Sequence, residues 1–223
     1  MDYKVIRSKR KTIAIYIRDN EVEVRTPLNM LKSDIDRFVL SKEKWIKDNL
    51  AKSKEKSVKR EEFSLNYGDK ILFRGIEYTI VAKDGNRAGF DEKEFFMPKG
   101  MTPEHIKATC VHLYRILAKK YLTHRTIEIA KQMSVAPKAI KINSSRTRWG
   151  SCSQQKSINY SWRLILADDE VIDYVIAHEL AHLTEMNHSD RFWKIVENVY
   201  PDFQVRRMRL RELQKKLYIE KWE

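Results

Sequence analysis

Residues 168–182 read DDEVIDYVIAHELAH, and this stretch decides the structure expected around it. Asp168 and Asp169 can cap the start of a helix, because negative charge is favourable at the positive end of the helix dipole. Apolar residues then recur at intervals of three and four, which predicts a helix with a buried face. On such a helix His178 and His182 lie one turn apart on the same face, so both imidazoles can reach one metal ion.

The residues around this pair favour a zinc site with an open position for water. Glu179 follows the first histidine and can accept a proton from an attacking water, as in His-Glu-x-x-His zinc hydrolases. A catalytic zinc usually has three protein ligands, and His188 is our candidate for the third. Glu185 is the rival, since some zinc enzymes use a carboxylate. We expect one Zn²⁺ per chain and a left-handed turn at Asn187.

Several further motifs accompany the histidine helix. They are TRWGSC at 147–152, NYSWRL at 159–164, YVIAHELAH at 174–182 and NHSDRFW at 187–193. This combination closely resembles the YgjP-like metallopeptidase family, which is similar to the SprT-like and WLM zinc proteases. The close similarity covers about residues 140 to 215, and a looser similarity extends over nearly the whole chain. It implies that His178, His182 and His188 bind the metal and that Glu179 is the catalytic residue, and it says less about the substrate.

A basic segment precedes this region and is a candidate for substrate binding. We expect a strand over 146–152 at the border of the cleft, where an extended peptide could add to its edge. Gly150 would let another backbone approach closely. Arg146 and Arg148 would lie on one side of the strand and could bind a phosphate or a carboxylate. Alternatively, they pair with acidic residues such as Asp173.

The pattern of the whole chain indicates an α+β protein. Residues 1–100 are expected to form an N-terminal mixed β/α region with strands, a hairpin turn at Asp19–Asn20 and a helix capped by Ser33. Charged residues 52–62 are the best internal linker, and the expected domain boundary lies at 98–100. Residues 101–223 are expected to form a zincin-like catalytic domain. Its elements are a long helix from Thr102, a small antiparallel sheet, the active-site helix and two further helices.

Composition limits the setting of the protein. The 223 residues are 42% hydrophobic, enough for a folded core, and no apolar run approaches the length of about 18 residues that spans a bilayer. Two cysteines and no secretory signal favour a cytoplasmic protein, which we expect to be a monomer without membrane contact. Net charge is +13, with +8 in residues 1–60 and +4 in 203–223. The basic ends suggest nonspecific nucleic-acid binding, although solvated helix faces would give the same counts.

Three functions fit these features. The leading hypothesis is a zinc-dependent hydrolase of the metallopeptidase type, in which activated water attacks a peptide carbonyl with Glu179 as general base. An oxyanion donor is also needed, and Arg148, Tyr160 and Tyr174 are candidates. An alternative is a nucleoside triphosphate pyrophosphatase or phosphohydrolase that uses the same site. The third hypothesis is a non-enzymatic nucleic-acid-binding protein, which an intact Glu179 disfavours.

Overall fold

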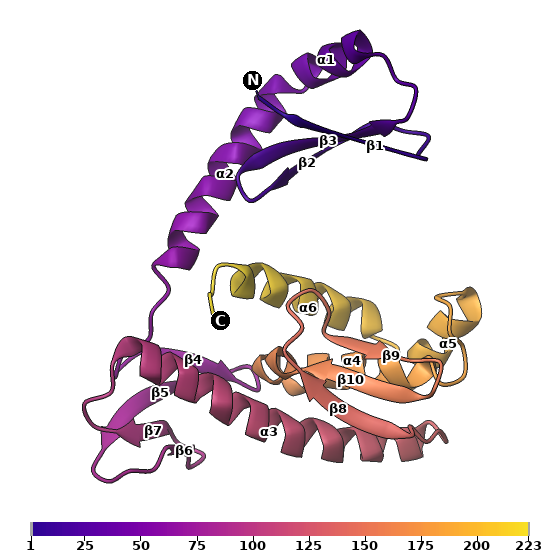
Figure 1. Ribbon diagram of the computed structural model, residues 1–223. Coiled ribbons are helices and arrows are strands. Elements are labelled where there is room, and N and C mark those ends of the chain that lie inside the picture. The colour runs from indigo at the N-terminus through magenta and orange to yellow at the C-terminus, as the bar shows by residue number, and fades with distance from the viewer. Residues whose placement is uncertain (1, 223) are drawn as a thin grey trace. The chain divides into compact units, whose positions relative to one another are not determined.

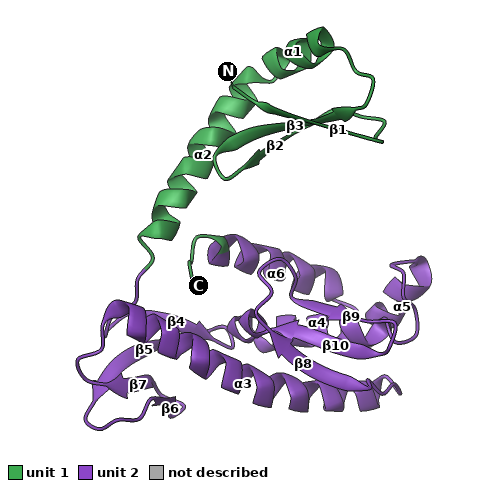
Figure 2. Ribbon diagram, in the orientation of Figure 1, with its two compact units in different colours: residues 1–63, 218–221 green, residues 64–217, 222–223 purple. Residues whose placement is uncertain are grey.

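A computed structural model describes residues 2–222, and the chain divides into two compact units (Figures 1 and 2). The first unit comprises residues 1–63 with 218–221, and the second comprises 64–217 with 222–223. The fold class is α+β, as expected. The sequence suggested a boundary at 98–100, whereas this division places the strands of residues 64–98 in the unit that holds the histidine helix.

The first unit is a three-stranded sheet covered by two helices. The central strand, β3, runs parallel to β1 and antiparallel to β2. Asp19 and Asn20 both have positive φ, so the expected hairpin turn joins β2 to β3. The core consists of Val22, Val24, Ile35, Val39 and Ile46. The elements are β1 (Lys4–Ser8), β2 (Ala14–Arg18), β3 (Glu21–Pro27), α1 (Lys32–Ser41) and α2 (Glu43–Glu61).

The helical part of this unit differs from the expectation in two ways. The helix breaks at Lys42, and its N-cap is Leu31, which makes no side-chain cap hydrogen bond, instead of Ser33. Residues 52–61 of the expected linker belong to α2. Lys and Glu are good helix formers, and pairs such as Glu55 with Lys59, 2.7 Å apart, support an exposed helix that buries little surface.

The second unit begins with a four-stranded sheet of order β4-β5-β7-β6. Its aromatic side chains pack together and against α3, with the ring centroids of Phe95 and Tyr114 5.6 Å apart. The Tyr114 hydroxyl donates a hydrogen bond to the carbonyl of Leu72 at 2.6 Å, which ties the sheet to the helix. The elements are β4 (Lys70–Phe73), β5 (Ile76–Lys83), β6 (Gly89–Phe90), β7 (Phe95–Pro98) and α3 (Pro103–Gln132).

The rest of the second unit follows the expected order of long helix, small sheet and histidine helix. The sheet has the order β8-β10-β9 and is mixed instead of antiparallel, because β8 runs parallel to β10. β8 and β10 can run in the same direction because β9, which lies between them in the sequence, runs in the opposite direction. The elements are β8 (Ala139–Asn143), β9 (Gly150–Cys152), β10 (Ser157–Ser161), a 3₁₀ helix (Trp162–Leu166), α4 (Asp169–Ala181), α5 (Asp190–Val199) and α6 (Phe203–Tyr218).

The β4–β5 hairpin fixes the start of the histidine helix α4. Arg74 and Gly75, at the tip of the hairpin, both have positive φ. The backbone N–H of Arg74 donates to the carbonyl of Ile165 at 2.8 Å, and its guanidinium binds both carboxylate oxygens of Asp169. A Cβ on Gly75 would lie 2.7 Å from the Cβ of Asp168, so only glycine allows this close approach. Strands of the N-terminal half therefore support the site.

Helix α3 holds α4 from another side. The guanidinium of Arg125 donates two hydrogen bonds of 2.6 Å to the buried carboxylate of Asp173, forming a bidentate pair. The pairing of Asp173 with Arg146 or Arg148 that the sequence allowed is therefore not seen. Within residues 2–222, no helix is both long and apolar enough to cross a lipid bilayer.

Candidate active site

Helix α4 carries the first two expected site residues and is almost wholly buried. Asp168 is its N-cap, with a side chain that accepts a hydrogen bond from the backbone N–H of Val171 at 3.0 Å. The apolar face is buried as its spacing predicted. His178 and Glu179 lie in the last turn, and His182 is the C-cap. The rigid helix therefore fixes the directions of these three side chains.

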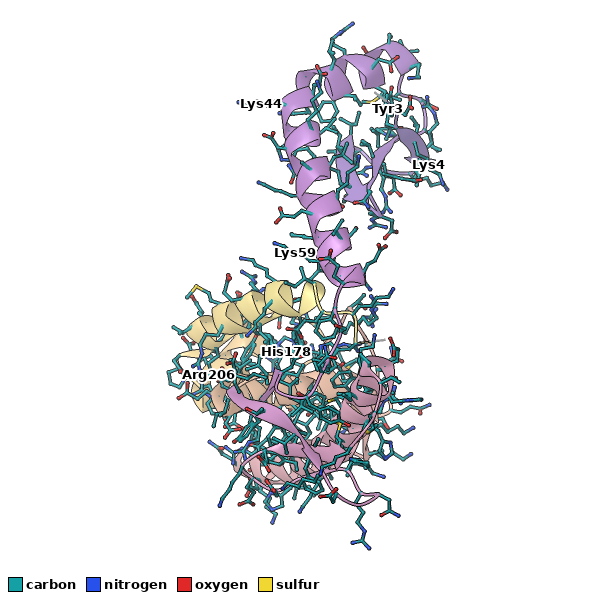
Figure 3. All side chains as sticks on the ribbon, turned by 90° about the vertical axis from the view of Figure 1, so that its left-hand side faces the viewer. Tyr3, Lys4, Lys44, Lys59, His178 and Arg206 are labelled. Carbon is teal, nitrogen blue, oxygen red and sulfur yellow. The ribbon has the colours of Figure 1, made fainter. Side chains whose placement is uncertain are left out.

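The structure brings His178, His182 and His188 together. One ring nitrogen of each lies within 4.8 Å of the other two, which is the arrangement that could hold a metal ion. The Nε2 atoms of His178 and His188 are 3.0 Å apart. Figure 3 shows the side chain of His178 in the second unit. The carboxylate of Glu185, the rival ligand, is not part of this group.

A tight turn brings His188 back toward α4. The N–H groups of Thr184 and Glu185 donate to the carbonyl of Ala181 at 3.1 and 2.9 Å. The Nδ1 atom of His182 donates to the carbonyl of Glu185 at 3.1 Å, which orients the ring and leaves Nε2 free for a metal. The left-handed conformation expected at Asn187 is absent, because these hydrogen bonds already reverse the chain.

Aromatic rings of α5 enclose the histidines. The ring of Phe192 lies 4.5 Å from that of His182 and 4.9 Å from that of His178, measured between centroids. Trp193 stacks on His188 at 5.7 Å. Ser189, directly after His188, caps α5 through a hydrogen bond from the N–H of Phe192. The third histidine is therefore held at a helix start between packed rings.

Burial disfavours the charged form of His178 and His182. It lowers the pKa of His178 to about 3, and the neighbouring His182 and His188 act in the same direction. Burial also lowers the pKa of His182, although its hydrogen bond to the Glu185 carbonyl opposes this. A neutral imidazole is the form that binds a metal, so the environment favours the ligating state. Burial raises the pKa of Glu179 to about 8.

Strand β9 crosses the helix beside the Glu179 carboxylate. A Cβ on Gly150 would lie 2.6 Å from Cγ and 2.7 Å from Oε1 of Glu179. We expected Gly150 to admit another backbone, but it is the glutamate side chain that approaches. A cavity of about 180 Å³ opens at this point. It is lined by Arg148, Trp149, Gly150, Tyr174, Val175, His178, Glu179 and Leu210.

The two candidate arginines occupy different places. Residues 146–149 form a bent loop, and the strand begins only at Gly150, so the arginines do not share one side of a strand. Arg148 lines the cavity beside Glu179, whereas Arg146 is exposed and lines none of the cavities described here. Within residues 2–222, neither guanidinium has an ion pair.

The candidate oxyanion donors are also separated by the structure. Tyr160 is fully buried and accepts a hydrogen bond from the Thr126 hydroxyl at 3.3 Å. Tyr174 lines the cavity, and its ring centroid lies 6.0 Å from that of His178. Cys152 lies near Glu179, but burial raises the pKa of its thiol, which disfavours a nucleophilic thiolate.

The chain matches one known protein family over most of its length. The family model of the YgjP-like metallopeptidase domain matches residues 11–213. The chain belongs to the YgjP-like metallopeptidase family. The match includes most of the first unit, so this family extends beyond the segment of close motif similarity. None of the curated proteins compared with the chain matches it significantly.

Solved structures of two metallopeptidase zymogens are similar to part of this YgjP-like chain. Jannalysin of Methanocaldococcus jannaschii has 22% identity and a TM-score of 0.37, covering 42% of this chain and 95% of its own. Abylysin of Pyrococcus abyssi has 22% identity and a TM-score of 0.36, covering 45% and 94%.

Some residues of this YgjP-like site were not found from the sequence. Phe192 and Trp193 appeared only as members of a motif, yet they pack on all three histidines. Arg207 of α6 lies 5.2 Å from the Trp193 ring centroid, and Leu210 of the same helix lines the cavity. Their distance along the chain from the motifs concealed both. The helical periodicity of α6 was the sequence signal that could have indicated Arg207 and Leu210.

Proposed function

We propose that the protein is a zinc-dependent metallopeptidase in which His178, His182 and His188 bind one zinc ion and Glu179 is the general base. One observation carries the proposal. Three imidazole nitrogens lie within 4.8 Å of one another, next to a buried carboxylate and a cavity bordered by a sheet edge. A structural zinc site has no need for such a carboxylate, because its ligands fill every coordination position.

The donor set fits zinc. Three imidazoles with one position left open form a common arrangement in catalytic zinc sites. The His182 ring is already oriented by the Glu185 carbonyl. Nδ1 of His178 is buried without a hydrogen-bond partner among the described residues, while its Nε2 faces His188. One ring nitrogen of each imidazole therefore lies close to those of the other two, an arrangement that a shared cation would stabilise.

The chemistry divides between the ion and the protein. When bound, zinc makes a water nucleophilic near neutral pH and polarises the substrate carbonyl. The Glu179 carboxylate takes a proton from the attacking water and returns it to the leaving amine. A nearby cation favours the charged form of this carboxylate and so opposes the effect of burial on its pKa. Gly150 leaves the space in which the carboxylate sits.

The free edge of strand β9 and the family of the chain both favour a peptide as the substrate. Strand β9 pairs only with β10 among the described strands, so its other edge can bind an extended peptide through backbone hydrogen bonds. Tyr174 lines the same cavity as His178 and Glu179, and we assign it the donor that stabilises the developing oxyanion. The family of metallopeptidases supports the same substrate class.

The decisive experiment compares the zinc-loaded wild type with Glu179→Gln. Turnover of casein and of a peptide library should fall at least about a hundredfold, the usual scale for a general base, with unchanged zinc content. Glu185→Gln is the matched control, because it removes a nearby carboxylate that is outside the histidine group. Glu179-dependent hydrolysis of nucleoside triphosphates, with no peptide cleaved, would replace this proposal by the phosphoanhydride alternative.

A further inference from the structure

A second cavity, of about 260 Å³, lies on the other face of the β8-β10-β9 sheet. Along β10 the side chains alternate, with Tyr160 toward α3 and Asn159 toward the opposite face. Gly150 is paired with Tyr160 and faces Glu179, whereas Ser151 is paired with Asn159. Asn159 and Ser151 therefore point away from the catalytic carboxylate, and both line the second cavity.

Apart from Gly150, the residues that line this cavity have polar side chains; none is acidic, and one is positively charged. Its residues are Asn143, Ser145, Thr147, Arg148, Gly150, Ser151, Asn159 and Ser161. Existing hydrogen bonds use the Asn143 and Ser145 side chains as acceptors, whereas the Ser161 hydroxyl donates to the Ser145 carbonyl at 2.7 Å. The N–H of Ser145 donates to Oδ1 of Asn143 at 2.9 Å, and the N–H of Arg148 donates to Oγ of Ser145 at 3.2 Å.

These bonds leave the donors of Asn143, Ser145 and Arg148 free. The Asn143 amide retains its NH₂ group, and the Ser145 hydroxyl retains its hydrogen. The Arg148 side chain has no ion pair or hydrogen bond among the described residues, so its guanidinium is available. A cavity with one guanidinium, several hydroxyl and amide donors and no negative charge suits a carboxylate, which accepts hydrogen bonds only.

The second cavity adjoins the catalytic cavity. Arg148 and Gly150 line both. A peptide added to the free edge of β9 would direct successive side chains to opposite faces of the sheet. One side chain would then point toward α4 and its neighbour toward the polar cavity. If the side chain next to the cleaved bond points toward α4, the side chains on either side of it in the peptide therefore point toward the polar cavity, and the reverse also holds.

We infer that the polar cavity is a specificity subsite for an Asp or Glu side chain close to the cleaved peptide bond, with Arg148 as its charged contact. This inference rests on the proposed peptidase function. It makes acidic peptides the preferred substrates of a protein that is itself strongly basic, at net +13. That overall charge also raises the local concentration of acidic chains around the protein.

The cleavage test uses short Ala/Ser peptides that carry one central Glu or its neutral isostere Gln. The wild type should cleave the Glu peptide about tenfold to a hundredfold faster in kcat/KM, the range expected for hydrogen bonds to a charged group. Arg148→Gln should remove most of this preference, measured as the ratio of kcat/KM for the Glu peptide to that for the Gln peptide, because that ratio cancels any common effect of Arg148 on catalysis. Arg146→Gln removes the same charge from the same loop but outside both cavities, and it should keep the preference.

A binding test separates the inference from the proposed function. Zinc-loaded Glu179→Gln protein is titrated with the labelled Glu and Gln peptides, and fluorescence anisotropy gives Kd. Asn159→Asp, a near-isosteric change that adds a negative charge to the cavity, should weaken binding of the Glu peptide about tenfold and leave the Gln peptide nearly unchanged.

The two tests give distinct outcomes. Preferential binding of the Glu peptide that Asn159→Asp weakens, without cleavage of any peptide by the wild type, would support the subsite and reject the peptidase. Cleavage with equal rates for the Glu and Gln peptides would support the peptidase and reject the subsite. A preference lost equally in Arg146→Gln and Arg148→Gln would also reject it, because the effect would then be one of overall charge.

Discussion

Replacing Gly150 with alanine would place a methyl group against the Glu179 carboxylate. The added Cβ would lie 2.6 Å from Cγ and 2.7 Å from Oε1, whereas ordinary contacts begin at 3.4 Å, so the carboxylate must move by about 0.7 Å. Glu179 has only 6% of its surface exposed, so it has little free space. A misplacement of about 1 Å can lower a rate about a hundredfold, and overpacking costs about 1–3 kcal/mol of stability.

We therefore expect kcat of Gly150→Ala to fall about a hundredfold, with zinc content unchanged and a modest loss in urea-unfolding free energy. Gly89→Ala is the matched control. Its Cβ would lie 2.7 Å from the ring of Phe96 in the β6–β7 pair, away from the histidines. It should lose comparable stability and keep full activity. Equal kcat values for Gly150→Ala and the wild type would refute the placement of the glutamate against β9.

The remaining predictions concern the metal, the oxyanion and the start of α4. Metal analysis should show that His188→Ala loses zinc and that Glu185→Ala retains it; the reverse result would exchange the ligands. Tyr174→Phe should lower kcat about a hundredfold with unchanged zinc content, the usual effect of losing one oxyanion donor, and near wild-type turnover would exclude this role. Hydrogen bonds from Arg74 lower the pKa of Asp169, so the ionised carboxylate stabilises the fold above its ordinary pKa of 3.8. The unfolding free energy of Asp169→Asn should be below that of the wild type at neutral pH and converge with it as the pH falls below 3.8; a pH-independent difference would contradict this.

Local patterns predicted the parts of the site that depend on local geometry. The one-turn spacing of His178 and His182 follows from helix geometry alone, and the N-cap at Asp168 follows from its side chain. The hairpin at Asp19–Asn20 is likewise a property of two adjacent residues. His188, six residues after His182 in the sequence, also lies in the histidine group.

Features that depend on distant contacts were not predictable in this way. The bend over 146–149 replaces expected strand, because hydrogen bonds such as that from the Ser161 hydroxyl to the Ser145 carbonyl, 2.7 Å, hold the loop. The contact between Gly150 and Glu179 joins residues from separate elements. The expected monomer, the cytoplasmic setting and the nucleic-acid binding stay predictions.

The docking of the β4–β5 hairpin onto α4 determines where the chain can be shortened. A fragment starting at residue 101 would contain every histidine of the site. It would lack Arg74, which pairs with Asp169, and the Leu72 carbonyl, which accepts the hydrogen bond of the Tyr114 hydroxyl. The start of the histidine helix would then be uncovered, together with the aromatic surface of Tyr114. The smallest fragment that retains the site therefore has to begin ahead of β4, near Ser64.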